Sequence, residues 1–119
     1  MSVDGRRETL RRYQAIWNGE EDLANLDALL APDFVGHIGS RERDLTRLKE
    51  DIAAYRSGAP SVRFTVEHQF GEGDFLATRL RAETIQDGNP IAVRGINISR
   101  WDGDRLAEEW AVWETFPSA

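Results

Sequence analysis

Residues 62–114, VRFTVEHQFGEGDFLATRLRAETIQDGNPIAVRGINISRWDGDRLAEEWAVWE, alternate between apolar and polar side chains over most of their length. A period of two is typical of β-strands, whose successive side chains point to opposite faces of a sheet. Turn residues rich in glycine, asparagine and aspartate interrupt the alternation at 71–74, 87–90 and 102–104. The pattern therefore predicts four strands, at 62–70, 75–86, 91–101 and 105–116, joined as an antiparallel meander.

Three helices are predicted before this meander. The first carries Leu10, Tyr13 and Trp17 on one apolar stripe and ends at the Asn18–Gly19 pair. A second, short helix begins at the acidic run 20–22 and is expected to end at Pro32, and a short strand is predicted at 34–38. The third helix has its apolar stripe within 45–55 and stops before Gly58 and Pro60. Helices followed by an antiparallel meander indicate an α+β fold in a single domain, residues 1–119.

Four arginines lie in the first predicted helix, at positions 6, 7, 11 and 12. Glu8 and Arg12 are spaced i, i+4 in the order that stabilises a helix, so we interpret the cluster as a solvated face. The chain has a single lysine, Lys49, which the pattern places on the surface of the third helix. We therefore do not expect catalysis through a lysine amine.

Charge and composition exclude several function classes. The 119 residues contain 15 Lys and Arg against 21 Asp and Glu, a net charge of −6, which argues against binding nucleic acid or an anionic membrane. No apolar run approaches the roughly 18 residues of a membrane span, and no signal-peptide core is visible near the start. There is no cysteine, so disulfides and thiol chemistry are excluded. The expected compartment is the cytoplasm.

Common nucleotide-binding, metalloprotease and serine-hydrolase motifs are missing from the sequence. The two histidines, His37 and His68, are far apart and have no third partner, so a three-histidine zinc site cannot form, and a site with two histidines and a carboxylate is disfavoured. We expect His68 to have a structural role. The remaining chemistry is that of a pocket lined by carboxylate, histidine, tyrosine and tryptophan.

The last predicted strand holds the candidate acid/base. Strict alternation places Leu106, Glu108, Trp110, Val112 and Glu114 on one face. A carboxylate beside large apolar side chains is partly desolvated, which raises its pKa toward the range useful for proton transfer. The alternative is that Glu114 is an ordinary solvated acid at a frayed strand end.

Three further polar or aromatic groups are candidates. His37, in the short strand at 34–38, either contacts a substrate oxygen or simply hydrogen-bonds its neighbours. Asn97 is polar within an apolar strand, so if buried it needs a partner, and a ligand is one option. For Tyr13 and Trp17, packing in the core is the first interpretation.

Several segments together resemble the SnoaL-like polyketide cyclase branch of the nuclear transport factor 2-like superfamily. They are RYQAIWNG at 12–19, LDALLAPDFVGH at 26–37, RFTVE at 63–67, GINISRW at 95–101 and LAEEWAVWE at 106–114. The resemblance implies a cone-shaped barrel in which three helices close a strongly curved antiparallel sheet around an apolar pocket. It also implies a homodimer through the outer face of the sheet, and neither a metal nor an organic cofactor.

In that branch, a pocket carboxylate near the end of the last strand acts as acid/base in an intramolecular aldol closure. The residue is usually Asp, and Glu114 stands at the matching position; His37 matches a histidine that is frequent in the branch. The resemblance thus predicts an acid/base enzyme acting on a small, largely apolar or aromatic carbonyl or epoxide compound. The predicted substrate-binding residues are Tyr13, Trp17, Phe34, Asn97 and Trp110. The alternative is a non-catalytic ligand-binding or dimerisation module.

Overall fold

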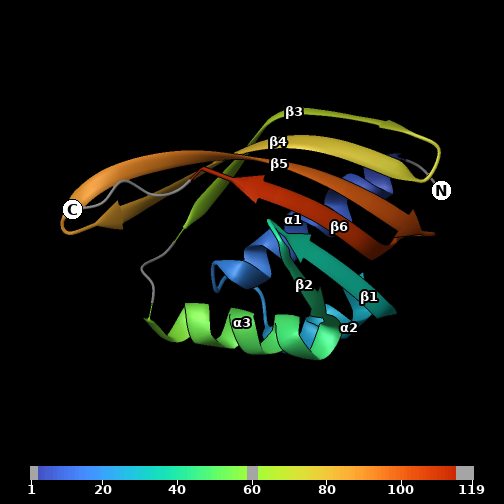
Figure 1. Ribbon diagram of the computed structural model, residues 1–119, viewed down its shortest axis with the longest axis horizontal. Coiled ribbons are helices and arrows are strands. Elements are labelled where there is room, and N and C mark those ends of the chain that lie inside the picture. Colours follow the sequence, from blue (N-terminus) through green and yellow to red (C-terminus); the bar gives the residue numbers. More distant parts are fainter. Residues whose placement is uncertain (1–2, 59–61, 115–119) are drawn as a thin grey trace.

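A computed structural model describes residues 3–58 and 62–114 (Figure 1). The helices are α1 (Val3–Trp17), the single 3-10 turn η1 (Leu23–Asn25), α2 (Leu26–Leu29) and α3 (Leu45–Gly58). The strands are β1 (Leu30–Ile38), β2 (Arg41–Asp44), β3 (Arg63–Glu72), β4 (Phe75–Gln86), β5 (Asn89–Asp102) and β6 (Arg105–Trp113). Pro60 and the end of the last predicted strand, residues 115–116, lie outside the described residues.

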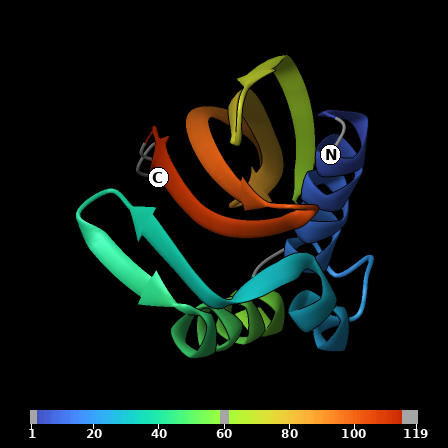
Figure 2. The same cartoon turned by 90° about the vertical axis from the view of Figure 1, so that its right-hand side faces the viewer.

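All six strands form one sheet in the order β2-β1-β6-β5-β4-β3. The meander β3–β6 is antiparallel throughout, whereas β1 pairs with β6 in parallel. Figure 2 shows the strands curving into an arch, with α1 along one side and α3 beneath β1 and β2. The predicted α+β class and the curved sheet covered by helices are confirmed.

The segment around β1 differs most from the prediction. Pro32, expected to end the second helix, lies inside β1, and the helix ends earlier, at Leu29. The register of β1 against β6 shifts between Leu30 and Val35, and proline is tolerated at such irregularities because no ladder hydrogen bond is needed there. Strand β2 was not predicted, because its four residues Arg41–Asp44 are all polar.

The hairpin turns follow their sequence signals. Asp87 and Gly88 connect β4 to β5 and both have positive φ, 51° and 78°, as a two-residue type I′ turn requires. Asn89 and Pro90, expected in the turn, are the first residues of β5. Strand β4 has the predicted bounds, Phe75–Gln86.

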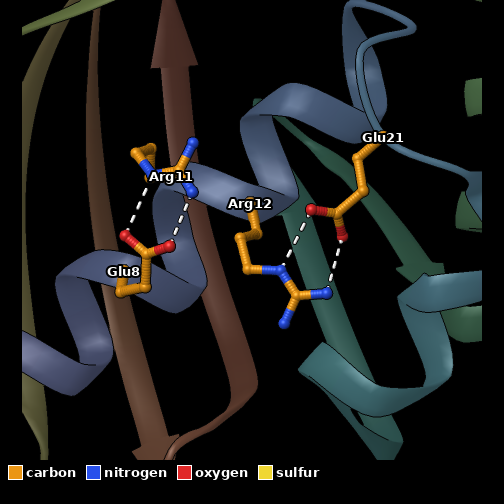
Figure 3. Close-up of polar contacts among 4 residues, drawn as sticks. All are labelled: Glu8, Arg11, Arg12 and Glu21. Atoms are coloured by element: carbon orange, nitrogen blue, oxygen red, sulfur yellow. Dashed lines mark hydrogen bonds and ion pairs between the residues drawn. The ribbon is translucent and has the colours of Figure 1, made fainter.

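The arginines of α1 are not one solvated face. Arg6 is only 5% exposed; its guanidinium donates to the carbonyls of Gly73 and Gly103, at 2.8 and 3.2 Å, and so ties two hairpin turns to the helix. Glu8 pairs with Arg11 rather than with Arg12, as Figure 3 shows, through contacts of 2.9 and 2.6 Å. Arg12 instead forms a bidentate pair with Glu21 beyond the end of the helix, at 3.0 Å for both contacts.

The main core lies between the helices and the concave face of the sheet. It is formed by apolar side chains of α1, α2, α3, β1, β4, β5 and β6: Leu10, Tyr13, Ile16, Leu26, Leu29, Leu30, Phe34, Leu48, Ile52, Leu76, Trp101 and Leu106. A second, smaller cluster of Val62, Ala82 and Val93 lies toward the other end of the arch. The space between the sheet and α1 at that end is not completely filled, and there the candidate site lies.

Candidate active site

A β-bulge in β6 decides which acidic side chain faces the interior. Leu106 pairs with Trp101, but Glu108 pairs with Arg100, so Ala107 is the extra residue on the bulged strand. Leu106 and Ala107 are both buried, and from there the alternation continues in the opposite phase. As a result Glu109 points inward, and Glu108 lies on the outer face.

Glu109 is the centre of a buried polar cluster. Its side chain is 3% exposed and accepts two hydrogen bonds, from the Tyr13 hydroxyl to Oε1 at 2.8 Å and from Asn97 Nδ2 to Oε2 at 2.7 Å. Tyr13 comes from α1 and Asn97 from the middle of β5, so three elements position the cluster. Both donors are neutral groups, and no arginine or lysine among the described residues forms an ion pair with Glu109.

This environment changes two pKa values. Burial raises the pKa of the Glu109 carboxyl above its ordinary 4.5, and the hydrogen bonds from Asn97 and Tyr13 only partly oppose the effect. Burial and the neighbouring Glu109 carboxylate also raise the pKa of Tyr13 well above 10.0, so the phenol keeps its proton and remains a donor. A carboxyl with a raised pKa, held by fixed donors, suits general acid/base work near neutral pH.

The cluster opens into an apolar cavity of about 260 Å³. Its polar lining consists of Tyr13, Gln14, Asn97 and Glu109, with Glu109 the only carboxylate among the described lining residues. The other lining residues are apolar or aromatic: Leu10, Trp17, Ile38, Tyr55, Val62, Phe64, Leu80, Ala82, Val93, Ala111 and Trp113. A wider surface hollow of about 680 Å³ shares Gln14, Val62 and Phe64 with the cavity. Ligands therefore have an approach beside α1.

The structure brings three of the predicted site residues together. Tyr13, Trp17 and Asn97 all line the cavity, and Trp17 packs edge-on against Tyr55 with ring centroids 5.6 Å apart. Phe34, predicted to bind substrate, is a core residue packed beneath Gly36 and is not among the described lining residues. Its burial in β1 satisfies the apolar pattern without giving it access to a ligand.

Glu114, predicted to be the desolvated carboxylate, is exposed and follows the end of β6. Its backbone N–H donates to the Arg94 carbonyl, but its side chain is not among those described as lining the cavity. The interpretation of Glu114 as the pocket acid was wrong because strict alternation from Leu106 ignores the bulge at Ala107. The buried carboxylate of this strand is Glu109.

His37 and Trp110 lie on the outer face of the sheet, opposite the cavity. His37 Nε2 contacts Glu108 Oε2 at 2.7 Å, and Arg100 Nε donates to Glu108 Oε1 at 3.2 Å. The hydrogen bond with His37 is the main cause that lowers the pKa of Glu108. Trp110 stacks on His37 with ring centroids 5.4 Å apart. Trp110, predicted to bind substrate, and His37, predicted to contact a substrate oxygen, are both absent from the described lining of the cavity, and His37 instead contacts its neighbours.

Glu109 and Gln14 are the site residues that the sequence pattern did not identify. A signal for Glu109 existed, because Glu109, Ala111 and Trp113 form the other face of the last strand, but Trp110 and Val112 made the wrong face look more apolar. Gln14 gave no signal, since it lies beside Tyr13 on an amphipathic helix.

Residues 3–58 and 62–114 contain no group of three or more histidine and acidic side chains arranged to hold a metal ion. Within the same ranges, no helix is both long and apolar enough to cross a bilayer.

The fold agrees with the comparisons with known proteins. Residues 7–118 match the sequence profile of the SnoaL-like polyketide cyclases. A loop-truncation variant of IdmH is 27% identical, with 92% of each chain covered and a TM-score of 0.79. Wild-type IdmH from Streptomyces antibioticus, a proposed polyketide cyclase, is 25% identical over 92% of this chain and 91% of its own, with a TM-score of 0.77.

TsrD from Streptomyces laurentii shares the fold at 20% identity, with 96% of this chain and 91% of its own covered and a TM-score of 0.80. A comparison with curated proteins found no significant match.

Proposed function

The chain belongs to the SnoaL-like polyketide cyclase family, and from this membership we propose that it is a cofactor-independent acid/base enzyme acting on small, largely apolar carbonyl compounds. Family and structural neighbours support a cyclase- or isomerase-like role. The observation that carries the proposal is Glu109, a buried carboxyl with two neutral donors at the base of an apolar cavity. An intramolecular aldol closure is the reaction that we favour.

The chemistry needs one group that takes and returns a proton. In the ionised state, a Glu109 oxygen removes a proton from the carbon beside a substrate carbonyl, which leaves an enolate. The enolate carbon attacks a second carbonyl of the same molecule, forming the new C–C bond, and the resulting alkoxide takes the proton back from Glu109. Reprotonation at a different carbon, without ring closure, would give an isomerase.

Size and electrostatics fit this role. The cavity of about 260 Å³ lies just below the roughly 300–1,000 Å³ usual for drug-sized ligands, so one or two rings fit. Apolar walls keep water from the enolate and strengthen every hydrogen bond inside. An epoxide-opening site with an arginine and two carboxylates is not supported, because Arg79 and Arg81 lie on the outer face of the sheet, where Arg79 pairs with Glu67 and Arg81 with Glu83.

The test uses proton exchange and needs no knowledge of the natural substrate. Enolisable ketones of one or two rings are incubated with the protein in D₂O, and loss of their α-proton signals is followed by NMR. We expect Glu109→Gln to reduce the exchange rate by at least about 100-fold, the usual contribution of general acid–base catalysis. Glu114→Gln is the matched control and should exchange at the original rate. Equal exchange by Glu109→Gln and the unaltered protein would refute the role of Glu109.

The rival function is a non-catalytic ligand-binding module, and the same assay separates the two. A module binds ketones without exchanging their protons. A cavity filled by tryptophan and phenylalanine side chains would favour it, whereas here the space is open and has a polar cluster at its base. We therefore favour an enzymatic function over a non-catalytic ligand-binding function.

We also propose that two copies pair through the outer face of the sheet. The large apolar side chains exposed across β3–β6 include Phe70, Phe75, Ile96, Ile98, Trp110 and Val112. Beside them lie charges of both signs, such as Arg79 and Arg94 around Glu67, which a two-fold axis can match with their own copies. Light scattering should report a dimer, and Ile96→Arg should make it monomeric; a monomer at all concentrations would contradict the pairing.

A further inference from the structure

Two amide atoms at the cavity have no hydrogen-bond partner among the described residues. They are Nε2 of Gln14, a donor, and Oδ1 of Asn97, an acceptor, and both atoms are inaccessible to bulk water. Buried polar atoms are almost always hydrogen-bonded, so each of these exceptions calls for an explanation. Gln14 and Asn97 line the same cavity, which makes a bound molecule the natural partner of both atoms.

The orientation of the Asn97 amide follows from its neighbour. Its Nδ2 donates to the Glu109 carboxylate at 2.7 Å, and an ionised carboxylate can only accept. The amide oxygen is therefore the atom left for a ligand while Glu109 is ionised. Asn97 Oδ1 is thus an unpartnered acceptor, which a hydroxyl or N–H group of a ligand can satisfy.

Gln14 offers an unpartnered hydrogen-bond donor, Nε2, at the side of the cavity formed by α1. It follows Tyr13 on α1 and lines both the inner cavity and the outer hollow, so it lies where the two spaces meet. Its unpartnered donor suits a carbonyl oxygen, which Asn97 Oδ1, an acceptor, cannot bind. A molecule that satisfies both residues needs one acceptor and one donor on an otherwise apolar frame.

We propose that Gln14 and Asn97 form a specificity pair that selects hydroxy ketones, with Gln14 Nε2 donating to the carbonyl and Asn97 Oδ1 accepting from the hydroxyl. This inference rests on the proposed function, because it concerns the same cavity, and it names the chemical class of the product that the cavity holds. An aldol closure creates this combination of groups, since its product keeps one carbonyl and gains one hydroxyl. The pair would then hold the closed product in place beside Glu109.

The experiment measures binding of three two-ring probes by NMR titration: 1-tetralone with only a carbonyl, 1-tetralol with only a hydroxyl, and 4-hydroxy-1-tetralone with both. Each satisfied hydrogen bond should strengthen binding by about three- to tenfold. The unaltered protein should therefore bind 4-hydroxy-1-tetralone more tightly than either single-group probe. Comparing probes on the same variant cancels general effects of a substitution on the cavity.

Two variants assign the preference to its residues. Gln14→Met removes the donor at nearly constant volume and should weaken both ketones by about three- to tenfold while 1-tetralol is unchanged. Asn97→Leu should abolish the preference for 4-hydroxy-1-tetralone over 1-tetralone. Gln69→Met is the matched control, because Gln69 already donates to Thr78 and does not line the cavity, and it should change none of the three affinities.

Three results would overturn the pair: no binding of any probe, equal affinities of the unaltered protein for all three, or a Gln14→Met protein that keeps the carbonyl preference. None of these measurements depends on proton transfer. A protein that shows the expected binding pattern but no α-proton exchange would retain the specificity pair and contradict only the acid/base function.

Discussion

Replacing Tyr13 by phenylalanine tests whether the buried cluster controls the protonation of Glu109. The substitution removes the hydroxyl that donates to Glu109 Oε1 at 2.8 Å and leaves the ring in the core. That hydrogen bond favours the ionised carboxylate and counteracts the effect of burial on its pKa. Tyr13→Phe should therefore raise the pKa of Glu109 further.

The size of the change follows from the charge state. A hydrogen bond to an ionised group contributes about 1.5–3 kcal/mol, and one between neutral groups about 1 kcal/mol. The pKa depends only on the difference between these two contributions, about 1 kcal/mol, because the hydrogen bond from Tyr13 stabilises the carboxylate by that much more than the carboxylic acid. One pKa unit corresponds to about 1.4 kcal/mol, so the pKa of Glu109 should rise by somewhat less than one unit relative to the unaltered protein.

Carboxyl ¹³C NMR measures this pKa directly, with Glu109→Gln to assign the signal. Stability gives an independent check. Because the pKa of Glu109 is higher in the folded than in the unfolded chain, the folded state binds more protons above pH 4.5, and stability falls as pH rises from there. Urea unfolding should show that Tyr13→Phe lowers the free energy of unfolding by about 1 kcal/mol more at about pH 9 than at about pH 4. The difference arises because the lost hydrogen bond is stronger when Glu109 is ionised, as the prediction takes it to be at the higher pH.

Tyr55→Phe is the control, because Tyr55 lines the same cavity and the two hydrogen bonds of Glu109 come from Tyr13 and Asn97. It should leave the pKa of Glu109 unchanged. A Tyr13→Phe protein in which that pKa is unchanged or lower would refute the idea that the phenol stabilises a buried carboxylate. The proton would then have to be shared differently within the cluster.

Three further predictions concern the scaffold. Arg6→Met should lower the free energy of unfolding by about 2–4 kcal/mol in urea, because two turn carbonyls lose a charged donor. Gly95→Ala should cost about 1–3 kcal/mol in the same assay and weaken binding of 1-tetralone, because the added methyl collides with the Trp113 ring that lines the cavity. Because the pKa of Glu108 is lower in the folded chain, its carboxylate contributes to folding stability above pH 4.5, and this contribution is lost as the pH falls. His37→Phe removes the main cause of that lowering, so thermal melts should show a shallower loss of stability in acid.

Much of the fold was predictable because the strands of the meander are defined by local features of the sequence, namely alternation and turn residues. Strand β4 was predicted with its observed bounds, since alternation is regular there and glycine-containing turns flank it on both sides. The pairing of β1 with β6 in parallel was not predicted, because it joins segments far apart in the chain and no local signal encodes it. The burial of Arg6 could not be predicted from the sequence either, since its hydrogen-bond partners are carbonyls of two turns far away in the chain.

The site was only partly predictable, and the reason lies in two adjacent residues. Glu108 and Glu109 are chemically identical, yet one pairs with His37 and Arg100 on the outer face and the other is buried beside Tyr13. Adjacent residues of a strand face opposite sides, and the bulge at Ala107 determines which of the two glutamates faces the cavity. Alternation alone cannot reveal such an extra residue.

The apolar character of Trp110 and Val112 hid the bulge. These side chains lie on the outer face, 37% and 68% exposed, and so made that face resemble the interior. If the outer face pairs two copies of the chain, as we propose, both faces of β6 are selected to be apolar for different reasons. Hydrophobic periodicity then has two acceptable phases, and only the pairing register determines which carboxylate can act in the cavity.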